Sequence, residues 1–163
     1  MKLTLCAVGK LGATVENNLA KDYISRAGQT GRGLGVSAVE LIEVDARKAA
    51  KAQTSALLKS QEADAIRDAL GETGVLITCD EHGEALTSRQ IARRIDGYKD
   101  RGERRVTFLI GGADGLDPSL LEASAFSLAF GPQTWPHALA RVMLAEQMYR
   151  GLSILAGSPY HRD

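Results

Sequence analysis

The chain has 163 residues, of which 44% are hydrophobic and 25% charged, and its 20 basic residues balance 20 acidic ones. This profile is typical of one globular domain that buries a core without needing disulfides or metals. A net charge of zero argues against indiscriminate binding to polyanions, although it allows a local basic patch.

The two cysteines, Cys6 and Cys79, lie far apart in apolar surroundings, and no Cys/His spacing typical of a metal site is present. We therefore expect no bound metal and two buried thiols in a reducing compartment. The N-terminal apolar run is too short for a signal peptide, and no window approaches the ~20 apolar residues of a membrane span. These features predict a cytoplasmic protein without a membrane anchor.

Short apolar runs alternate with longer helical stretches along the whole chain. The runs that predict strands are 2–8, 36–44, 74–80, 105–110 and 125–130. The stretches that predict helices are 13–27, 49–70, 87–101, a short segment after Asp117-Pro118, and 136–156. Strands separated by helices predict a single α/β domain, spanning residues 1–163, with a parallel sheet covered on both faces.

Two stretches leave their role open. The glycine-rich segment 28–35 is expected to be a flexible loop, and it lacks the Lys-Ser/Thr of a P-loop. The last helix carries an apolar stripe and further apolar residues around it, which fits either the core alone or the core plus a subunit interface. The stripe consists of Leu139, Val142, Met143, Tyr149 and Leu152.

Three late loops follow predicted strands, at 79–84, 111–117 and 131–137. Ligands of open parallel sheets bind at such positions, because loop amides and helix N-termini converge there. The first strand lacks the G-x-G-x-x-G turn of a dinucleotide fold, which argues against NAD. Gly111 and Gly112 would let the backbone approach a ligand closely, although a plain strand-to-helix turn would use them too.

Two groups of charged residues could face a ligand. His137 sits at the predicted start of the last helix, and Arg141 lies four residues on, hence on the same helix face. His137 alone is better explained as a capping or structural residue than as a ligand contact. From Arg89 to Arg105 there are seven basic residues against three acidic ones, which suits either phosphate contacts or a solvated helix face.

Three stretches carry a resemblance to a known family. They are L-I-G-G-A-D-G-L (109–116), W-P-H-A-L-A-R-V-M-L-A-E-Q-M-Y-R (135–150) and the terminal S-P-Y-H-R-D (158–163). In order and spacing they resemble the RlmH family of SPOUT-class methyltransferases, which act on a pseudouridine of large-subunit ribosomal RNA. The opening M-K-L-T-L-C-A-V-G-K is similar to the start of that family as well, so the likeness spans the chain.

The resemblance implies a C-terminal trefoil knot at about 75–157, a functional tail at 158–163 and a homodimer. It also implies S-adenosyl-L-methionine as the cofactor. By position, the cofactor would contact Cys79, Gly111, Gly112, Gly131, Pro132, Gln133, Thr134, Trp135 and Pro136. The implied reaction is methylation of N3 of a pseudouridine in 23S ribosomal RNA on the assembled ribosome.

The resemblance also points to catalytic groups in the tail. N3 of pseudouridine is neutral at pH 7 and must lose its proton before it can attack a methyl group. A histidine suits proton acceptance and an arginine suits stabilisation of the developing charge. We therefore expect catalysis from His161, Arg162 and Tyr160, and substrate binding from His137 and Arg141. A non-catalytic ribosome-binding or assembly protein, or another nucleotide-using α/β enzyme, remains an alternative.

Overall fold

The computed structural model describes residues 1–45, 54–71 and 74–162. Five strands form one sheet in the order β2-β1-β4-β3-β5, and every pairing is parallel. The strands are β1 (Lys2–Val8), β2 (Ala38–Val44), β3 (Val75–Ala85), β4 (Arg105–Ile110) and β5 (Phe126–Ala129). The predicted α/β class with a parallel sheet is confirmed.

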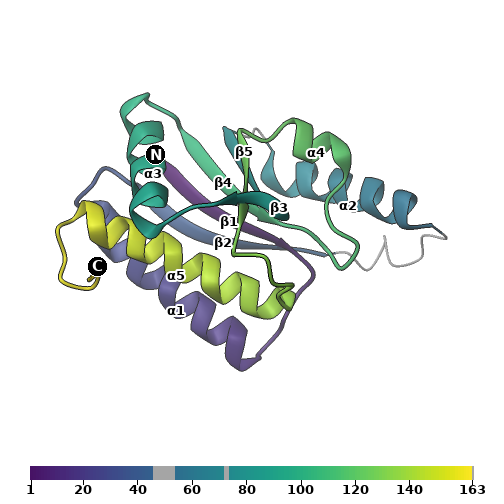
Figure 1. Ribbon diagram of the computed structural model, residues 1–163, viewed down its shortest axis with the longest axis horizontal. Coiled ribbons are helices and arrows are strands. Elements are labelled where there is room, and N and C mark those ends of the chain that lie inside the picture. The colour runs from purple at the N-terminus through teal and green to yellow at the C-terminus, as the bar shows by residue number, and fades with distance from the viewer. Residues whose placement is uncertain (46–53, 72–73, 163) are drawn as a thin grey trace.

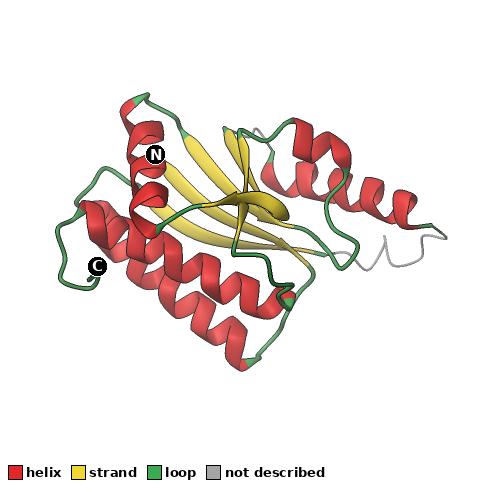
Figure 2. Ribbon diagram, viewed as in Figure 1, coloured by secondary structure: helices red, strands yellow, loops and turns green. Residues whose placement is uncertain are grey.

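Helices cover both faces of this sheet (Figures 1 and 2). The helices are α1 (Val15–Arg32), α2 (Ser55–Leu70), α3 (Ser88–Asp100), α4 (Pro118–Glu122) and α5 (His137–Leu155). In Figure 1, α1, α3 and α5 lie on one side of the sheet and α2 and α4 on the other. The two faces of the sheet are therefore buried under helical layers, as parallel sheets require.

The alternation of side chains along β1 separates the interior into two cores. Leu3, Leu5 and Ala7 pack with residues of α1, α3 and α5, whereas Cys6 and Val8 pack with residues of α2 and α4. This alternation follows from the two-residue period of a strand, which points successive side chains to opposite faces. All five residues are at most 6% exposed.

The glycine-rich stretch 28–35 is not the flexible loop that its composition suggested. Helix α1 continues through Gly28 and Gly31 to Arg32. A Cβ at Gly31 would lie 3.0 Å from the Cβ of Val36, so this glycine allows the end of α1 to pack against the following segment. Tertiary packing therefore extends the helix through residues of low helix propensity.

The expected helix 49–70 is observed from Ser55, and positions 49–53 lie outside the described residues. The expected loop 79–84 is also different, because β3 continues through it to Ala85. Both Cys79 and Glu84 pair with Leu128 of β5, so residues 80–83 form a bulge between them. A Cβ at Gly83 would lie 2.6 Å from backbone atoms of Ser127, so only glycine fits where the bulged strand returns.

Most helices begin with a side chain that accepts a hydrogen bond from a backbone N–H of the first turn, and α5 is the exception. Thr14, Thr54 and Thr87 each accept a hydrogen bond from the backbone N–H three residues on, at 3.2 to 3.3 Å. Helix α5 begins after Pro136 without any side-chain cap. Its first turn is therefore left with free backbone N–H donors beside the third late loop.

Candidate active site

The carboxyl ends of β3, β4 and β5 surround a cavity of about 620 Å³, which we call the loop pocket. This volume lies within the range of small-molecule and cofactor sites. Seven of the predicted site residues line it: Cys79, Gly111, Gly131, Gln133, Thr134, Trp135 and His137. Gly112, Pro132 and Pro136 do not, although they lie next in sequence to residues that do. Lys59 of α2, Asp80 and Asp114 add charge to the wall.

Close backbone approach explains the glycines of this pocket. A Cβ at Gly112 would lie 2.6 and 2.7 Å from the two carboxylate oxygens of Glu62, a residue of α2 that is 6% exposed. Gly131 has a φ of +100°, and a Cβ there would lie 2.8 Å from the side-chain oxygen of Gln133. Both positions therefore need glycine for a local geometric reason.

The titrating groups around the loop pocket are tuned by burial. Burial, and secondarily the carboxylate of Asp114, raise the pKa of Glu62 above its ordinary value. Burial, and secondarily Asp80, raise the pKa of the Cys79 thiol to about 12. The Cys79 thiol is therefore protonated at neutral pH and does not act as a nucleophile.

The structure separates His137 from Arg141, which were expected to face one ligand together. His137 is exposed and lines the loop pocket. Arg141 is 1% exposed and donates to Glu43 Oε1 at 3.0 Å, to the Val8 carbonyl at 2.5 Å and to the Gly9 carbonyl at 2.8 Å. Arg141 therefore ties α5 to the ends of β1 and β2, and helical spacing alone could not reveal this.

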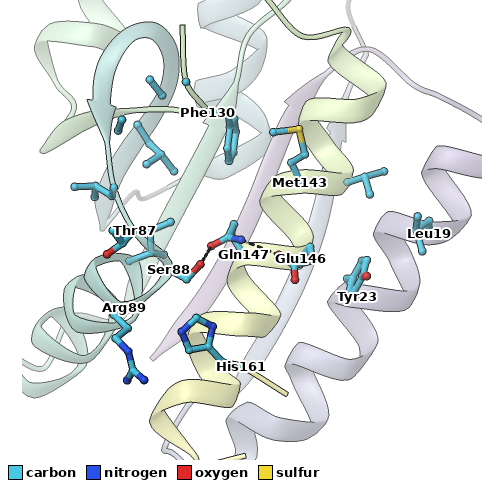
Figure 3. A pocket seen from close by; sticks show the side chains of 17 residues that line it. Leu19, Tyr23, Thr87, Ser88, Arg89, Phe130, Met143, Glu146, Gln147 and His161 are labelled. Carbon is cyan, nitrogen blue, oxygen red and sulfur yellow. Dashed lines mark hydrogen bonds between the residues drawn. The ribbon is translucent and has the colours of Figure 1, made fainter. Parts of the chain in front are cut away.

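A second cavity of about 780 Å³, which we call the tail groove, lies between α1, the start of α3 and α5 (Figure 3). Figure 3 shows Tyr23 of α1, Ser88 and Arg89 of α3, Glu146 of α5 and His161 of the tail around this space. Within it, the Ser88 hydroxyl donates to the Gln147 side-chain oxygen at 2.8 Å. The groove has an apolar end near Leu19, Val142 and Met143 and a polar end near His161.

The C-terminal tail is held in the polar end by side chains of α5. The Tyr160 hydroxyl donates to Glu146 Oε1 at 3.0 Å, and the Tyr160 ring lies 4.6 Å from the Tyr149 ring, centroid to centroid. Arg150 lies over the Tyr160 ring at 4.7 Å and donates two further hydrogen bonds to Glu146 Oε1. Burial, followed by hydrogen bonds to Tyr23 and Glu146, raises the pKa of Tyr160. The phenol therefore stays protonated and keeps donating.

His161 contacts a guanidinium of α5. Arg150 Nη1 lies 3.3 Å from His161 Nδ1, and a guanidinium can only donate a hydrogen bond. Nδ1 is therefore the ring nitrogen without a proton in this contact. Arg162 is exposed beyond it. Of the three predicted catalytic residues, His161 lines the groove, Tyr160 contacts its lining residue Glu146, and Arg162 is exposed to solvent.

The two cavities are adjacent. Leu128, Phe130 and Gly131 line both of them, at the end of β5 and in the segment that follows. Phe130 lies at the same end of the tail groove as Met143, whereas His161 and Arg89 lie at the other end (Figure 3). The two cavities therefore meet at apolar and backbone surface, and the polar side chains of the groove lie beyond it.

The fold and the paired cavities define a class of enzyme. Residues 1–161 match the family model described as "Predicted SPOUT methyltransferase", so the chain belongs to the SPOUT methyltransferase family. A probable methylase family protein from Haemophilus influenzae Rd KW20 has a similar fold, with a TM-score of 0.51 at 12% identity over 99% of this chain and 70% of that one.

Within this family, the resemblance to RlmH is confirmed over the whole length. Proteins named "Ribosomal RNA large subunit methyltransferase H" are 57% identical in Caulobacter sp. (strain K31) and 53% identical in Phenylobacterium zucineum (strain HLK1). Both alignments cover 100% of this chain and 100% of the relative. A third relative of the same name, from Dinoroseobacter shibae, is 47% identical over 99% of both chains.

Four residues in or beside the two cavities escaped sequence reasoning: Tyr23 and Glu146, which line the tail groove, Arg150, which contacts His161, and Glu62, which lies against Gly112. Glu146 and Arg150 stand four residues apart on α5 with Tyr149 between them, a spacing that could have marked a polar edge on an apolar helix. Tyr23 and Glu62 carried no such signal, because only the tertiary fold brings α1 and α2 to the sites. Among the described residues, no helix is long and apolar enough to span a membrane, and no group of three or more acidic, His or Cys side chains could hold a metal.

Proposed function

We propose that this protein methylates N3 of a pseudouridine in 23S ribosomal RNA, using S-adenosyl-L-methionine, on the assembled ribosome in the cytoplasm. The observation that carries the proposal is the contact between two unlike cavities. One is built of loops that suit a cofactor, and the other contains groups that handle protons and negative charge. The names of the full-length relatives supply the substrate class.

The residues of the loop pocket fit this cofactor. Gly111, Gly112 and the segment Gly131–Pro136 offer backbone groups and close approach, while the Trp135 ring is 40% exposed and available for stacking. The carboxylates of Asp80 and Asp114 are available to the cationic groups of the compound. When bound, the cofactor supplies a methyl group on a positively charged sulfur. No metal is needed for such a transfer.

The tail groove then has to remove the N3 proton and stabilise the charge left behind. His161 accepts the proton at Nδ1, the nitrogen that Arg150 covers in the free protein. Arg150 and Arg162 stabilise the resulting imidate, because a guanidinium attracts an anion and donates hydrogen bonds to it. Tyr160, held by Glu146, positions the target nucleobase. His137 contacts the substrate from the loop pocket. In this scheme Arg141 acts by holding α5 in place.

We extend the proposal to a homodimer and to a trefoil knot at about 75–157, as the family resemblance implies. Support for the dimer comes from apolar side chains near the shared end of α1 and α5. Val15, Leu19 and Leu139 are 80%, 43% and 42% exposed, respectively. A second protomer that covered them would also enclose the apolar end of the tail groove.

Mass spectrometry of 23S ribosomal RNA from cells with and without the protein tests the reaction. We expect one methyl group to disappear from a pseudouridine and to return when purified protein and S-adenosyl-L-methionine are added to ribosomes. If no methyl group is missing, the protein is a non-catalytic ribosome-binding or assembly factor. Thermal stabilisation by FMN or NAD, but not by S-adenosyl-L-methionine, would instead indicate another nucleotide-using enzyme.

A further inference from the structure

Helix α3 bears a groove on its exposed side that the proposed reaction does not use. The groove has a volume of about 410 Å³, and its lining residues are Glu84, Leu86, Gln90, Arg93, Arg94, Gly97, Tyr98 and Arg101. Those from α3 recur every three or four residues and so share one helix face. Gly97 has no side chain, which leaves space between the arginines. We call this surface the arginine groove.

The three arginines are held in different ways. Arg94 lies over the Phe126 ring at 4.3 Å and donates to Glu84 Oε2 at 2.9 Å. Arg101 lies over the Tyr98 ring at 4.7 Å. Arg93 is exposed and forms no ion pair with any described residue. A guanidinium stacked on a ring keeps its N–H donors in the plane pointing outward, where they can bind an anion.

The arginine groove has a net charge of +2, because Glu84 is the only acidic residue in its lining. The whole chain has a net charge of zero, so positive charge is concentrated here and compensated elsewhere. Bidentate binding by arginine side chains is well suited to phosphate groups. A row of phosphates therefore fits the groove better than an apolar partner or an acidic protein loop of irregular shape.

The arginine groove continues from the tail groove. Leu86 lines both, and Arg89 at the start of α3 lines the tail groove beside His161. A strand of nucleic acid with one base in the tail groove would pass Leu86 and Arg89 and then follow α3 toward Arg101. The positive charge thus lies where the backbone next to a target nucleotide would run.

We infer that the arginine groove binds the ribose-phosphate backbone of the RNA substrate beside the methylated nucleotide. This inference rests on the proposed function and adds the surface that holds the RNA. It also assigns a role to the basic run 89–105, for which the sequence alone favoured a solvated helix face over phosphate contacts. Contacts of this kind add affinity and orientation and carry no base specificity.

The test compares the double variant Arg93→Ala/Arg101→Ala with two controls. Lys21→Ala/Arg32→Ala removes the same charge from exposed positions of α1. Arg93→Lys/Arg101→Lys keeps the charge in the groove. Binding to purified ribosomes is measured by co-sedimentation at several salt concentrations, and methylation is measured at several ribosome concentrations. Melting temperatures establish that all variants are folded.

We expect the alanine pair to weaken ribosome binding and to raise KM by about tenfold, with kcat unchanged. The dependence of log Kd on log salt should become shallower by about 1.4 to 1.8, which corresponds to two lost phosphate contacts. The α1 control should match wild type, and the lysine pair should keep the salt dependence. Equal loss in the α1 control, or no loss in the alanine pair, would overturn the inference.

Two further outcomes separate the inference from the proposed function. If wild type binds ribosomes through the groove but transfers no methyl group, the RNA surface stands and the proposed reaction fails. A protein-free transcript of the large-subunit RNA region around the target distinguishes RNA from ribosomal protein as the partner. If the alanine pair binds this transcript as tightly as wild type, the groove contacts protein and the inference is wrong.

Discussion

The loop pocket and the tail groove are neighbours built by opposite means. The loop pocket owes its shape to the backbone, at strand ends where glycines permit close approach. The tail groove owes its chemistry to side chains on the edge of one helix, α5, and to the tail that these side chains hold. Substitutions that change backbone geometry should therefore affect the loop pocket, and substitutions of single side chains should affect the tail groove. Each kind of substitution should have little effect on the other cavity.

Deletion of Tyr160–Asp163 should separate the two sites most completely. Methylation should fall by at least about 100-fold, because the proposed base and its partners are removed. Stabilisation by S-adenosyl-L-methionine in a thermal melt should persist, since no tail residue from 158 to 162, the part that the structure describes, lines the loop pocket. His161→Ala should reproduce the loss in single-turnover assays. Activity within about threefold of wild type would exclude His161 as the base.

Replacement of Arg141 tests whether that residue supports the fold or the substrate. Arg141→Met removes the guanidinium from Glu43, which keeps only the Leu11 N–H, and from the Val8 and Gly9 carbonyls, and should cost about 3–5 kcal/mol of unfolding free energy. Urea denaturation measures this, with Arg32→Met on exposed α1 as the control. If the variant keeps wild-type stability but has a raised KM for ribosomes, Arg141 binds the substrate, as the sequence predicted.

Gly112→Ala should damage the loop pocket alone. Its methyl group would collide with the buried Glu62 carboxylate, and relief of such overpacking costs about 1–3 kcal/mol. The strain should also displace Gly111 and Ala113, which line the loop pocket, so we expect S-adenosyl-L-methionine to bind about tenfold more weakly by calorimetry. The contacts between Tyr160 and Glu146 should be unaffected. Unchanged affinity would show that the 111–115 turn can move without cost.

Glu62, which lies against Gly112 beside the loop pocket, should also make the stability of the protein depend on pH. Its pKa is raised in the folded state, so the unfolded chain loses the Glu62 proton first as pH rises above the ordinary value of 4.5. The stabilisation present below that pH is then lost as pH rises through the folded-state pKa. Glu62→Gln should flatten the decline of melting temperature above pH 4.5. An unchanged profile would mean that other groups dominate it.

The smallest effect is expected far from both sites. Gly28 lies inside α1, and a Cβ there would meet no atom within 4 Å. Gly28→Ala should therefore stabilise the protein by about 0.5–1 kcal/mol through helix propensity alone. Chemical denaturation measures the gain, and methylation and cofactor binding should remain at wild-type levels. Destabilisation would mean that the end of α1 needs glycine for a reason beyond space.

The sequence predicted the loop pocket better than the tail groove for a physical reason. Apolar runs and helix starts repeat along the chain, and parallel strands bring their carboxyl ends together, so the positions of the loops follow from local pattern. The continuation of β3 through residues 80–83 could not be seen, because Asp80 to Gly83 read as a turn when β5 is absent. Gly28 and Gly31 led to a wrong prediction for the same reason. They suggested a loop, whereas packing against α5 keeps this part of α1 helical.

The tail groove depends on pairings between residues from separate elements. His161 and Arg162 were found through family resemblance, and the carboxylate and guanidinium that hold the tail were not found at all. Helical spacing placed Arg141 beside His137 correctly along the helix, but it could not tell that Arg141 points into the protein toward Gly9. Whether a helical side chain points into the protein or toward solvent depends on which elements pack against each helix face. A single sequence does not show this packing.

The contacts of Arg141 have a consequence for how the enzyme is made. They join positions separated by 132 and 133 residues, the end of the first strand and the first turns of the last helix. During translation β1 and β2 are synthesised early, but the carbonyls at the end of β1 receive their guanidinium only when α5 emerges. The same helix carries Glu146, Arg150 and the tail. Neither the buried contacts of Arg141 nor the walls of the tail groove can therefore form before α5 has been synthesised.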